Sequence, residues 1–174
     1  MKSIYFILTD TGTILSRIVK HFMKDEFGHI SISLDKKLRH MYSFGRLKPY
    51  NTFYGGFVHE NIRKGTFKRF YKTKARIYEY QITDEQYNDL KKEILKLKKD
   101  RRKLHFNVLG LFAIYFKIKR RKDDYFYCAE FVKYVTEKAN INLGLPELVR
   151  PEDFKYIKGS KVIYEGILRE YKTV

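Results

Sequence analysis

The sequence predicts an α+β fold in which a small antiparallel, barrel-like sheet packs against helices. Short segments rich in β-branched and aromatic residues, such as 29–34, lie between turn-forming residues and predict strands. Three longer segments, near 14–24, 84–99 and 128–139, repeat apolar residues every three or four positions and predict helices. Because the 174 residues contain no linker or internal repeat, we expect one domain spanning 1–174.

The first third of the chain predicts a strand, a helix and a hairpin. Residues 3–8 are an apolar run that predicts a buried strand, and Thr13 is a candidate N-cap for the helix over 14–24. In 29–34, Ile30, Ile32 and Leu34 alternate with His29, Ser31 and Ser33, as in a strand with two different faces. We expect a return strand at 38–44.

The middle of the chain predicts a loop, a strand pair and a helix. Pro49, Asn51 and paired glycines make 45–56 loop-like, and 57–60 predicts a short strand or a turn. Aromatic and β-branched residues predict a pair of strands within 67–82. Thr83 and Gln86 have the spacing of a capping box at the start of the second helix. A more apolar segment follows at 106–116.

The last third contains the only cysteine, at the start of a predicted helix. Cys128, Phe131, Val132 and Val135 have helical spacing, and the helix is expected to end near 139–140. In the first turn of a helix, backbone N–H groups and the partial positive charge favour a thiolate. A turn at 150–154 and a last strand at 161–165 complete the predicted fold.

The amino-acid composition excludes several classes of protein and of metal site. One cysteine excludes an intramolecular disulfide and the zinc sites that need two or more cysteines, and the five histidines show no metal-ligand spacing. The N-terminal apolar run is too short for a signal peptide, and no run is long enough to span a membrane, so we expect a cytoplasmic protein.

The net charge of +17 favours polyanionic partners such as nucleic acid or anionic lipid headgroups. The basic runs at 91–103 and 117–122 are the candidate surfaces, although each is most simply explained as a solvated face. Oligomeric state is not encoded in any pattern of the sequence.

Cys128 as a nucleophile requires a base, and His29 is the upstream candidate. The pattern alone leaves a packed, unreactive thiol as the simpler interpretation of Cys128 and a solvated strand face as that of His29. His59 is expected at the surface. For Glu60 and Glu130, a salt bridge with lysine or arginine is favoured over a role in a pocket.

The order of these pieces resembles the circularly permuted branch of the NlpC-type, papain-like cysteine peptidase and amidase superfamily, which includes YiiX-like proteins and the lecithin:retinol acyltransferase group. Residues 28–34 resemble its histidine strand, and 127–132 resemble the start of its cysteine helix. Residues 150–154 followed by 162–166 resemble its closing turn and strand, and 41–58 resemble a bacterial subgroup of unassigned function.

The resemblance implies a permuted papain-like arrangement in which Cys128 attacks a carbonyl and His29 transfers the proton. A third group should orient the imidazole, and the strand register decides which one. In one register His40 and Tyr42 share the face of His29, and in the other Ser43 does. We predict His40, with Ser43 as the alternative. Ser43 and Tyr127 are also predicted to contact substrate.

These observations predict a cysteine-dependent hydrolase or acyl transferase that acts on an amide or ester bond, in a peptide or a lipid, through an acyl-thioester. That chemistry requires no metal or organic cofactor. The alternative is a catalytically inactive module of the same fold that binds an acidic partner, either lipid headgroups or nucleic acid. Salt-sensitive binding that is independent of Cys128 would indicate the module, and thiol-dependent turnover would indicate the enzyme.

Overall fold

The fold is described from a computed structural model. The structure describes residues 1–12, 26–48, 51–101, 105–106 and 125–173. The predicted helix over 14–24, nearly all of the apolar segment 106–116 and the basic run 117–122 lie outside these residues. The described elements are β1 (Lys2–Asp10), β2 (His29–Ser33), β3 (Met41–Lys48), β4 (Asn51–Glu60), α2 (Gly65–Arg69), β5 (Lys74–Ile82), α3 (Asp84–Asp100), β6 (His105–Phe106), β7 (Tyr125–Phe126), α5 (Cys128–Lys138), η1 (Pro151–Tyr156), β8 (Lys161–Ile167) and η2 (Leu168–Glu170).

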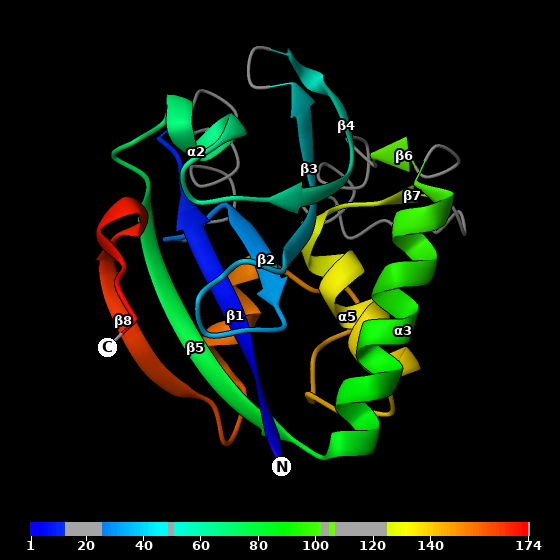
Figure 1. The fold of residues 1–174 in the computed structure, drawn as a ribbon. Helices are drawn as coiled ribbons and strands as arrows, with labels where there is room; N and C mark the ends of the chain where they lie inside the picture. Colours follow the sequence, from blue (N-terminus) through cyan, green and yellow to red (C-terminus); the bar gives the residue numbers. More distant parts are fainter. Residues whose placement is uncertain (13–25, 49–50, 102–104, 107–124, 174) are drawn as a thin grey trace.

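A six-stranded sheet forms the centre of the protein, in the order β4-β3-β2-β1-β5-β8 (Figure 1). Every neighbouring pair in it is antiparallel. This confirms a mixed α+β fold built on an antiparallel sheet. The sheet is open, because the outer strands β4 and β8 each pair on one side only among the described strands, so the expected barrel-like closure is absent. Strands β6 and β7 form a separate parallel pair.

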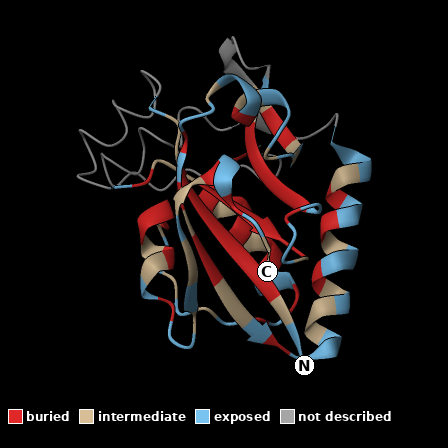
Figure 2. Ribbon diagram, turned by 60° about the vertical axis from the view of Figure 1, so that its left-hand side comes forward, coloured by how far each residue is buried: buried red, intermediate tan, exposed pale blue. Residues whose placement is uncertain are grey.

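Alternation along the strands gives the sheet two buried faces. In β1, Ile4, Phe6 and Leu8 pack with α3, α5 and η1, whereas Tyr5 and Ile7 pack with α2, the 34–41 turn and the C-terminal segment. Figure 2 shows the central strands buried and the outer side of the long helix exposed. Apolar burial on both faces provides the main stabilisation of the sheet.

Helix α3 begins as the sequence predicts. The Thr83 hydroxyl accepts from the Gln86 backbone N–H at 3.1 Å, and the Gln86 side chain accepts from the Thr83 N–H at 3.0 Å. These two bonds satisfy N–H groups that have no partner within the helix. Leu90, Ile94 and Leu97 are buried from this helix, at the predicted spacing.

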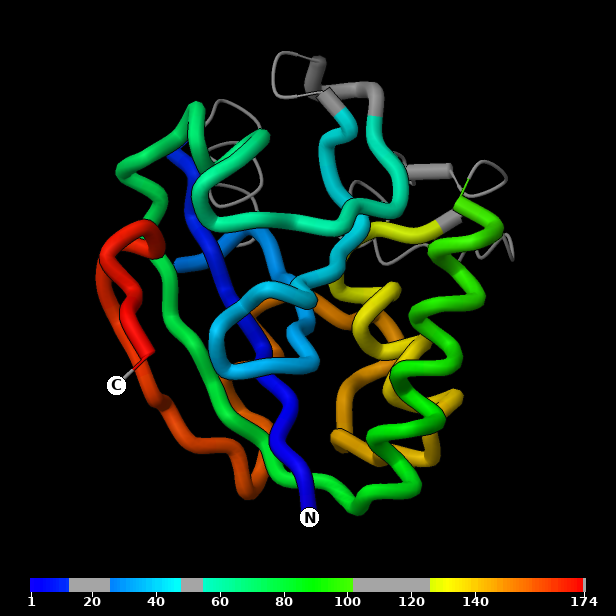
Figure 3. Tube along the Cα trace, in the orientation of Figure 1, coloured from blue at the N-terminus to red at the C-terminus, as the bar shows by residue number. Residues whose placement is uncertain are grey.

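Helix α5 lies between α3 and the sheet, and both ribbon and tube views show it beside α3 (Figures 1 and 3). Its buried residues include Phe131, Val132 and Val135, as predicted. Phe131 packs against the rings of Phe44 and Phe57 at centroid distances of 5.4 and 5.6 Å. These contacts attach the start of the cysteine helix to β3 and β4.

Two predicted segments differ from the structure. Residues 45–56, predicted as a loop, form most of the β3–β4 hairpin, in which Gly45 pairs with Gly56. Residues 67–82, predicted as two strands, contain the end of α2 and the single strand β5. In the first case the glycines lie inside strands, where they allow close approach of neighbouring groups rather than a turn. No helix in the described ranges is long and apolar enough to cross a membrane.

Candidate active site

The candidate nucleophile lies at the N-terminus of α5. Cys128 is the first residue of this helix, and the residue is buried, with 4% of its surface exposed. The carboxylate of Glu130 accepts from the Tyr127 N–H at 3.2 Å, which fixes the backbone where the helix begins. The N–H groups of the first turn have no acceptor within the helix, so they lie where negative charge on sulfur or on a bound oxygen is favoured.

His29 is the first residue of β2, and its imidazole interacts with Cys128. Hydrogen bonding and charge interaction with the Cys128 side chain both raise the pKa of His29. The imidazole Nε2 lies 3.1 Å from Glu60 Oε1, so Nδ1 is the nitrogen that remains for the thiol. The structure therefore brings together the two residues that the sequence analysis paired, although they are 99 positions apart in the printed sequence.

The group that holds the imidazole is Glu60, the last residue of β4. Its Oε1 also accepts from the Ser43 hydroxyl at 2.8 Å, and its Oε2 accepts from the Ser31 hydroxyl. The Glu60 side chain is 10% exposed and that of His29 22%. The carboxylate is thus a buried charge with hydrogen bonds from two hydroxyls and one imidazole, as a stable buried charge requires.

The register of the strands explains how these side chains meet. Strands β2 and β3 pair only at Ile32–Tyr42 and Ser33–Met41, so their ladder stops before it reaches Ser31 and Ser43. At this end of the strands, side-chain hydrogen bonds through Glu60 connect β2 to β3 in place of backbone bonds. The interrupted ladder lets the His29 ring interact both with Glu60 and with the N-terminus of α5.

Burial and charge attraction have opposite effects on the pKa values of His29 and Glu60. Burial favours the neutral imidazole, but attraction to Glu60, together with the Cys128 and Glu60 hydrogen bonds, outweighs it and raises the pKa of His29 to about 10. Burial likewise opposes ionisation of Glu60, whereas His29 and the two serine hydroxyls lower its pKa. Both shifts favour the charged forms, an imidazolium at His29 and a carboxylate at Glu60. An imidazolium beside Cys128 is the charge that would stabilise a thiolate.

Gly45 of β3 lies beside the imidazole. A Cβ at this position would lie 3.4 Å from His29 Cε1 and 3.5 Å from Ser43 Oγ. These are ordinary van der Waals distances, so a methyl group would fit beside the imidazole without displacing it.

His40, the predicted orienting residue, does not contact His29. Its Nδ1 lies 2.9 Å from Asp35 Oδ2, its side chain is 55% exposed, and its ring stacks on His59. The prediction of His40 is wrong in this structure because the register places Met41 and Ser43, not His40, on the face of Ser33. The alternative, Ser43, does reach the site, but through Glu60.

Tyr127 and Ser43 do not offer free groups to a substrate. The Tyr127 hydroxyl donates to the Val149 carbonyl at 2.8 Å, and the residue is buried as the N-cap of α5. Burial, with a smaller effect of nearby Glu130, raises the pKa of this phenol. Ser43 is fully buried and donates to Glu60. The two side chains therefore position Glu60 and the start of α5, and they do not offer a free hydroxyl to a substrate.

The segment from Val149 to η1 connects the two halves of the site. At one end, Val149 holds Tyr127 at the start of the cysteine helix. At the other, Glu152 Oε2 accepts from the backbone N–H groups of Glu26 and Phe27, at 3.2 and 3.3 Å, just before His29. These bonds fix where β2 begins relative to α5.

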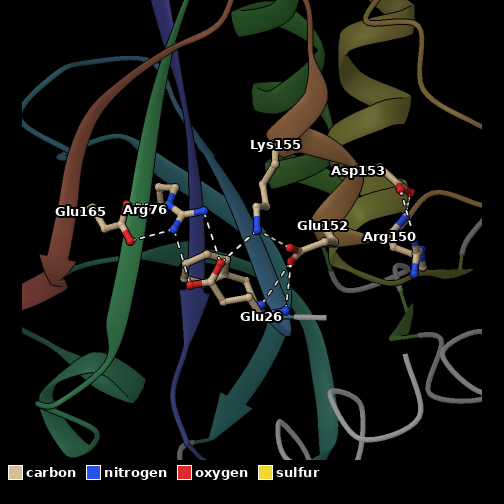
Figure 4. Close-up of polar contacts among 8 residues, drawn as sticks. Glu26, Arg76, Arg150, Glu152, Asp153, Lys155 and Glu165 are labelled. Carbon is tan, nitrogen blue, oxygen red and sulfur yellow. Dashed lines mark hydrogen bonds and ion pairs between the residues drawn. The ribbon is translucent and has the colours of Figure 1, made fainter. Parts of the chain in front are cut away.

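A network of ion pairs surrounds this junction (Figure 4). Lys155 contacts both Glu152 and Glu26, the latter at 2.9 Å, and Arg76 lies 3.3 Å from Glu26 and 2.7 Å from Glu165. A depression of about 340 Å³ opens beside it, lined in part by Glu26, Phe27 and Glu165. Neither Cys128 nor His29 lines that depression.

The described residues contain no group of three or more histidine, cysteine, aspartate or glutamate side chains arranged to hold a metal ion. The sequence analysis missed Glu60 as the partner of His29, because it favoured a salt bridge with lysine or arginine for this acid. No local sequence signal identifies Glu60, because its position opposite Met41 follows from the β3–β4 register, in which Gly45 pairs with Gly56.

No family model matches the chain, and a search among curated proteins found no match.

Proposed function

We propose that this protein is a thiol hydrolase or acyl transferase that acts on an amide or ester bond, with a permuted papain-like arrangement of its catalytic residues. Cys128 is the nucleophile, His29 the acid and base, and Glu60 the residue that orients and charges the imidazole. Support comes from the order of the elements, with the histidine strand before the cysteine helix, and from the contacts of His29.

The chemistry follows from the charge state of the site. The Cys128 thiolate attacks the substrate carbonyl, and the carbonyl oxygen becomes an oxyanion. When the tetrahedral intermediate collapses, the bond to the leaving nitrogen or oxygen breaks and the His29 imidazolium gives its proton to that atom. The neutral imidazole then takes a proton from water or from another acceptor. That acceptor attacks the thioester, and the thiolate is released.

The N-terminus of α5 provides the donors for the oxyanion. The N–H of Cys128 and its first-turn neighbours have no acceptor inside the helix, so they are oriented before the reaction begins. Removal of one such donor typically costs a hundredfold or more in turnover, about 3 kcal/mol. The single observation that carries the proposal is that one imidazole interacts with both Cys128 and Glu60.

Acylation by an activated ester, p-nitrophenyl acetate, tests this function. We expect a burst of p-nitrophenol that approaches one equivalent, and an intact mass raised by one acetyl group. Cys128→Ser should abolish the burst, His29→Ala should slow it, and the matched control His40→Ala should leave it unchanged because His40 contacts Asp35 instead.

Equal acylation of the wild type and Cys128→Ser would overturn the proposal. In that case salt-sensitive binding of a polyanion, unaffected by Cys128→Ser, would favour the inactive binding module.

A further inference from the structure

A basic surface that the sequence analysis did not single out surrounds α2. Between Asn61 and Tyr78 the chain contains no aspartate or glutamate. We call the following exposed cations, together with Tyr71, the α2 patch: Arg63, Lys64, Lys68, Arg69, Lys72 and Lys74. It lies at the end of β4 and the start of β5 (Figure 1).

The cations of the α2 patch differ in how close they lie to an acid. Lys64, Lys68 and Lys72 make no ion pair with an acid among the described residues, whereas Lys74 lies opposite Asp10 in the β1–β5 pairing. Helix α3, whose basic run the sequence suggested, is different. Its lysines alternate with acidic residues, and Lys96 lies 3.7 Å from Glu93. An anionic partner would therefore meet three lysines without a paired acid at α2, and lysines mixed with acids at α3.

Aromatic rings lie among these cations. Tyr71 is 53% exposed, and the Lys72 ammonium lies 5.8 Å from the centroid of its ring. The Phe70 ring is contacted by two guanidinium groups, those of Arg46 and Arg69, at 5.7 and 5.5 Å. Phe67, in contrast, is buried against the sheet and anchors the segment. An exposed tyrosine beside several lysines combines an apolar ring with charges suited to phosphate groups.

We propose that the α2 patch binds the surface of membranes that contain anionic phospholipids. The lysines and arginines interact with the headgroups, and the Tyr71 ring enters the interfacial region, where tyrosine is favoured. Single-stranded nucleic acid fits less well. Successive bases need several open rings, whereas the Phe70 ring is already contacted by two arginines and Tyr71 is the exposed one.

This binding is independent of the thiol chemistry. The residues that anchor α2 belong to the cluster on the sheet face opposite that of α3 and α5. The proposal therefore goes beyond the proposed function, and Cys128→Ser should leave membrane binding unchanged. Membrane binding and thiol chemistry can occur in one protein, so the acylation burst, and not this binding, decides between the enzyme and the inactive module.

Co-sedimentation with vesicles tests the proposal. We compare vesicles of phosphatidylcholine alone with vesicles in which about a third of the lipid is phosphatidylglycerol, at low and at raised ionic strength. We expect binding to the anionic vesicles only, weakened by salt. Each lysine near such a surface contributes about a fivefold factor in partitioning. The triple variant Lys64→Gln/Lys68→Gln/Lys72→Gln should therefore bind about a hundredfold more weakly.

The matched control carries the same change in net charge on α3, as Lys91→Gln/Lys92→Gln/Lys99→Gln, three exposed lysines. It should retain most of the binding, whereas Tyr71→Ala should weaken binding even at low salt. Equal losses in the two triple variants would show that net charge alone is responsible and would overturn the proposal. Binding of single-stranded RNA that needs the α2 lysines, without vesicle binding, would also overturn it.

Discussion

The substitution Glu60→Gln tests the electrostatic account of the site most sharply. Gln has nearly the same shape as Glu and retains a carbonyl oxygen for His29 and the serines, but it has no charge. Because the carboxylate is the largest of the influences that raise the pKa of His29 to about 10, its removal should lower that pKa. Loss of a close opposite charge typically shifts a pKa by about 1–3 units.

The same pair contributes to stability, with a defined pH dependence. The pKa of His29 rises from 6.5 to about 10 on folding, with attraction to Glu60 the largest of the influences that raise it and Cys128 a further one. Since the folded pKa of His29 is the higher one, its stabilisation is present below pH 6.5 and is lost as the pH rises toward 10. At acidic pH the pair is lost as well, once Glu60, whose folded pKa is lowered, takes up a proton.

Two assays measure the effect of Glu60→Gln. The His29 Cε1–H resonance, assigned with His29→Ala, should titrate at least one unit lower in the variant, and Cys128 alkylation should need a correspondingly higher pH. Urea unfolding near neutral pH should show a loss of up to about 3 kcal/mol. An unchanged His29 titration in a folded Glu60→Gln protein would refute the argument that this carboxylate charges the imidazole.

Three further tests, which use five substitutions, address the surroundings of the His29–Glu60 pair. Gly45→Ala should change the free energy of unfolding by less than about 1 kcal/mol and leave Cys128 alkylation nearly unchanged, because the new methyl group fits in van der Waals contact with the His29 ring. A large loss of alkylation in a folded variant would contradict this. Thr9→Val should be neutral or stabilising, since the buried Thr9 hydroxyl has no hydrogen-bond partner among the described residues, whereas Ser43→Ala should destabilise by about 1–3 kcal/mol because Glu60 loses a donor. Urea unfolding curves of the Thr9→Val and Ser43→Ala variants measure the two free energies of unfolding. An equal loss of stability in both variants would contradict the hydrogen bond assigned to Ser43. Glu152→Ala should shift the pH dependence of alkylation upward because it releases the backbone before His29, and Glu165→Gln, at the exposed end of the ion-pair network, should not.

Much of the fold could be predicted from local patterns. The strand at 29–34, the capped helix α3 and the helix that begins at Cys128 each carry a periodicity that only one secondary structure satisfies. Their existence follows from which residues must be buried, and burial is encoded locally. The position of Cys128 at a helix N-terminus was predictable for the same reason.

The partner of the imidazole could not be predicted in this way. In the return strand that the sequence predicts at 38–44, His40 and Ser43 lie on opposite faces, and a shift of one residue in register exchanges them. The β2–β3 register, which pairs Ser33 with Met41, decides between them. The β3–β4 register, in which Gly45 pairs with Gly56, places Glu60, although these glycines look like turn formers in sequence. Glu60 comes from the far end of that hairpin, so its role depends on a long-range pairing that no local pattern encodes.

The pH dependence of Cys128 alkylation by iodoacetamide, followed by intact mass in wild type and His29→Ala, tests the central claim most directly. Because the chain has one cysteine, a single adduct reports its reactivity. Alkylation in urea gives the rate for a fully exposed thiol, which corrects for the burial of Cys128. We predict that folded wild type is still alkylated at a mildly acidic pH at which the exposed thiol in urea no longer reacts, and that His29→Ala loses this reaction. A thiol that reacts only after unfolding, or equally in both proteins, would contradict the Cys128–His29 ion pair.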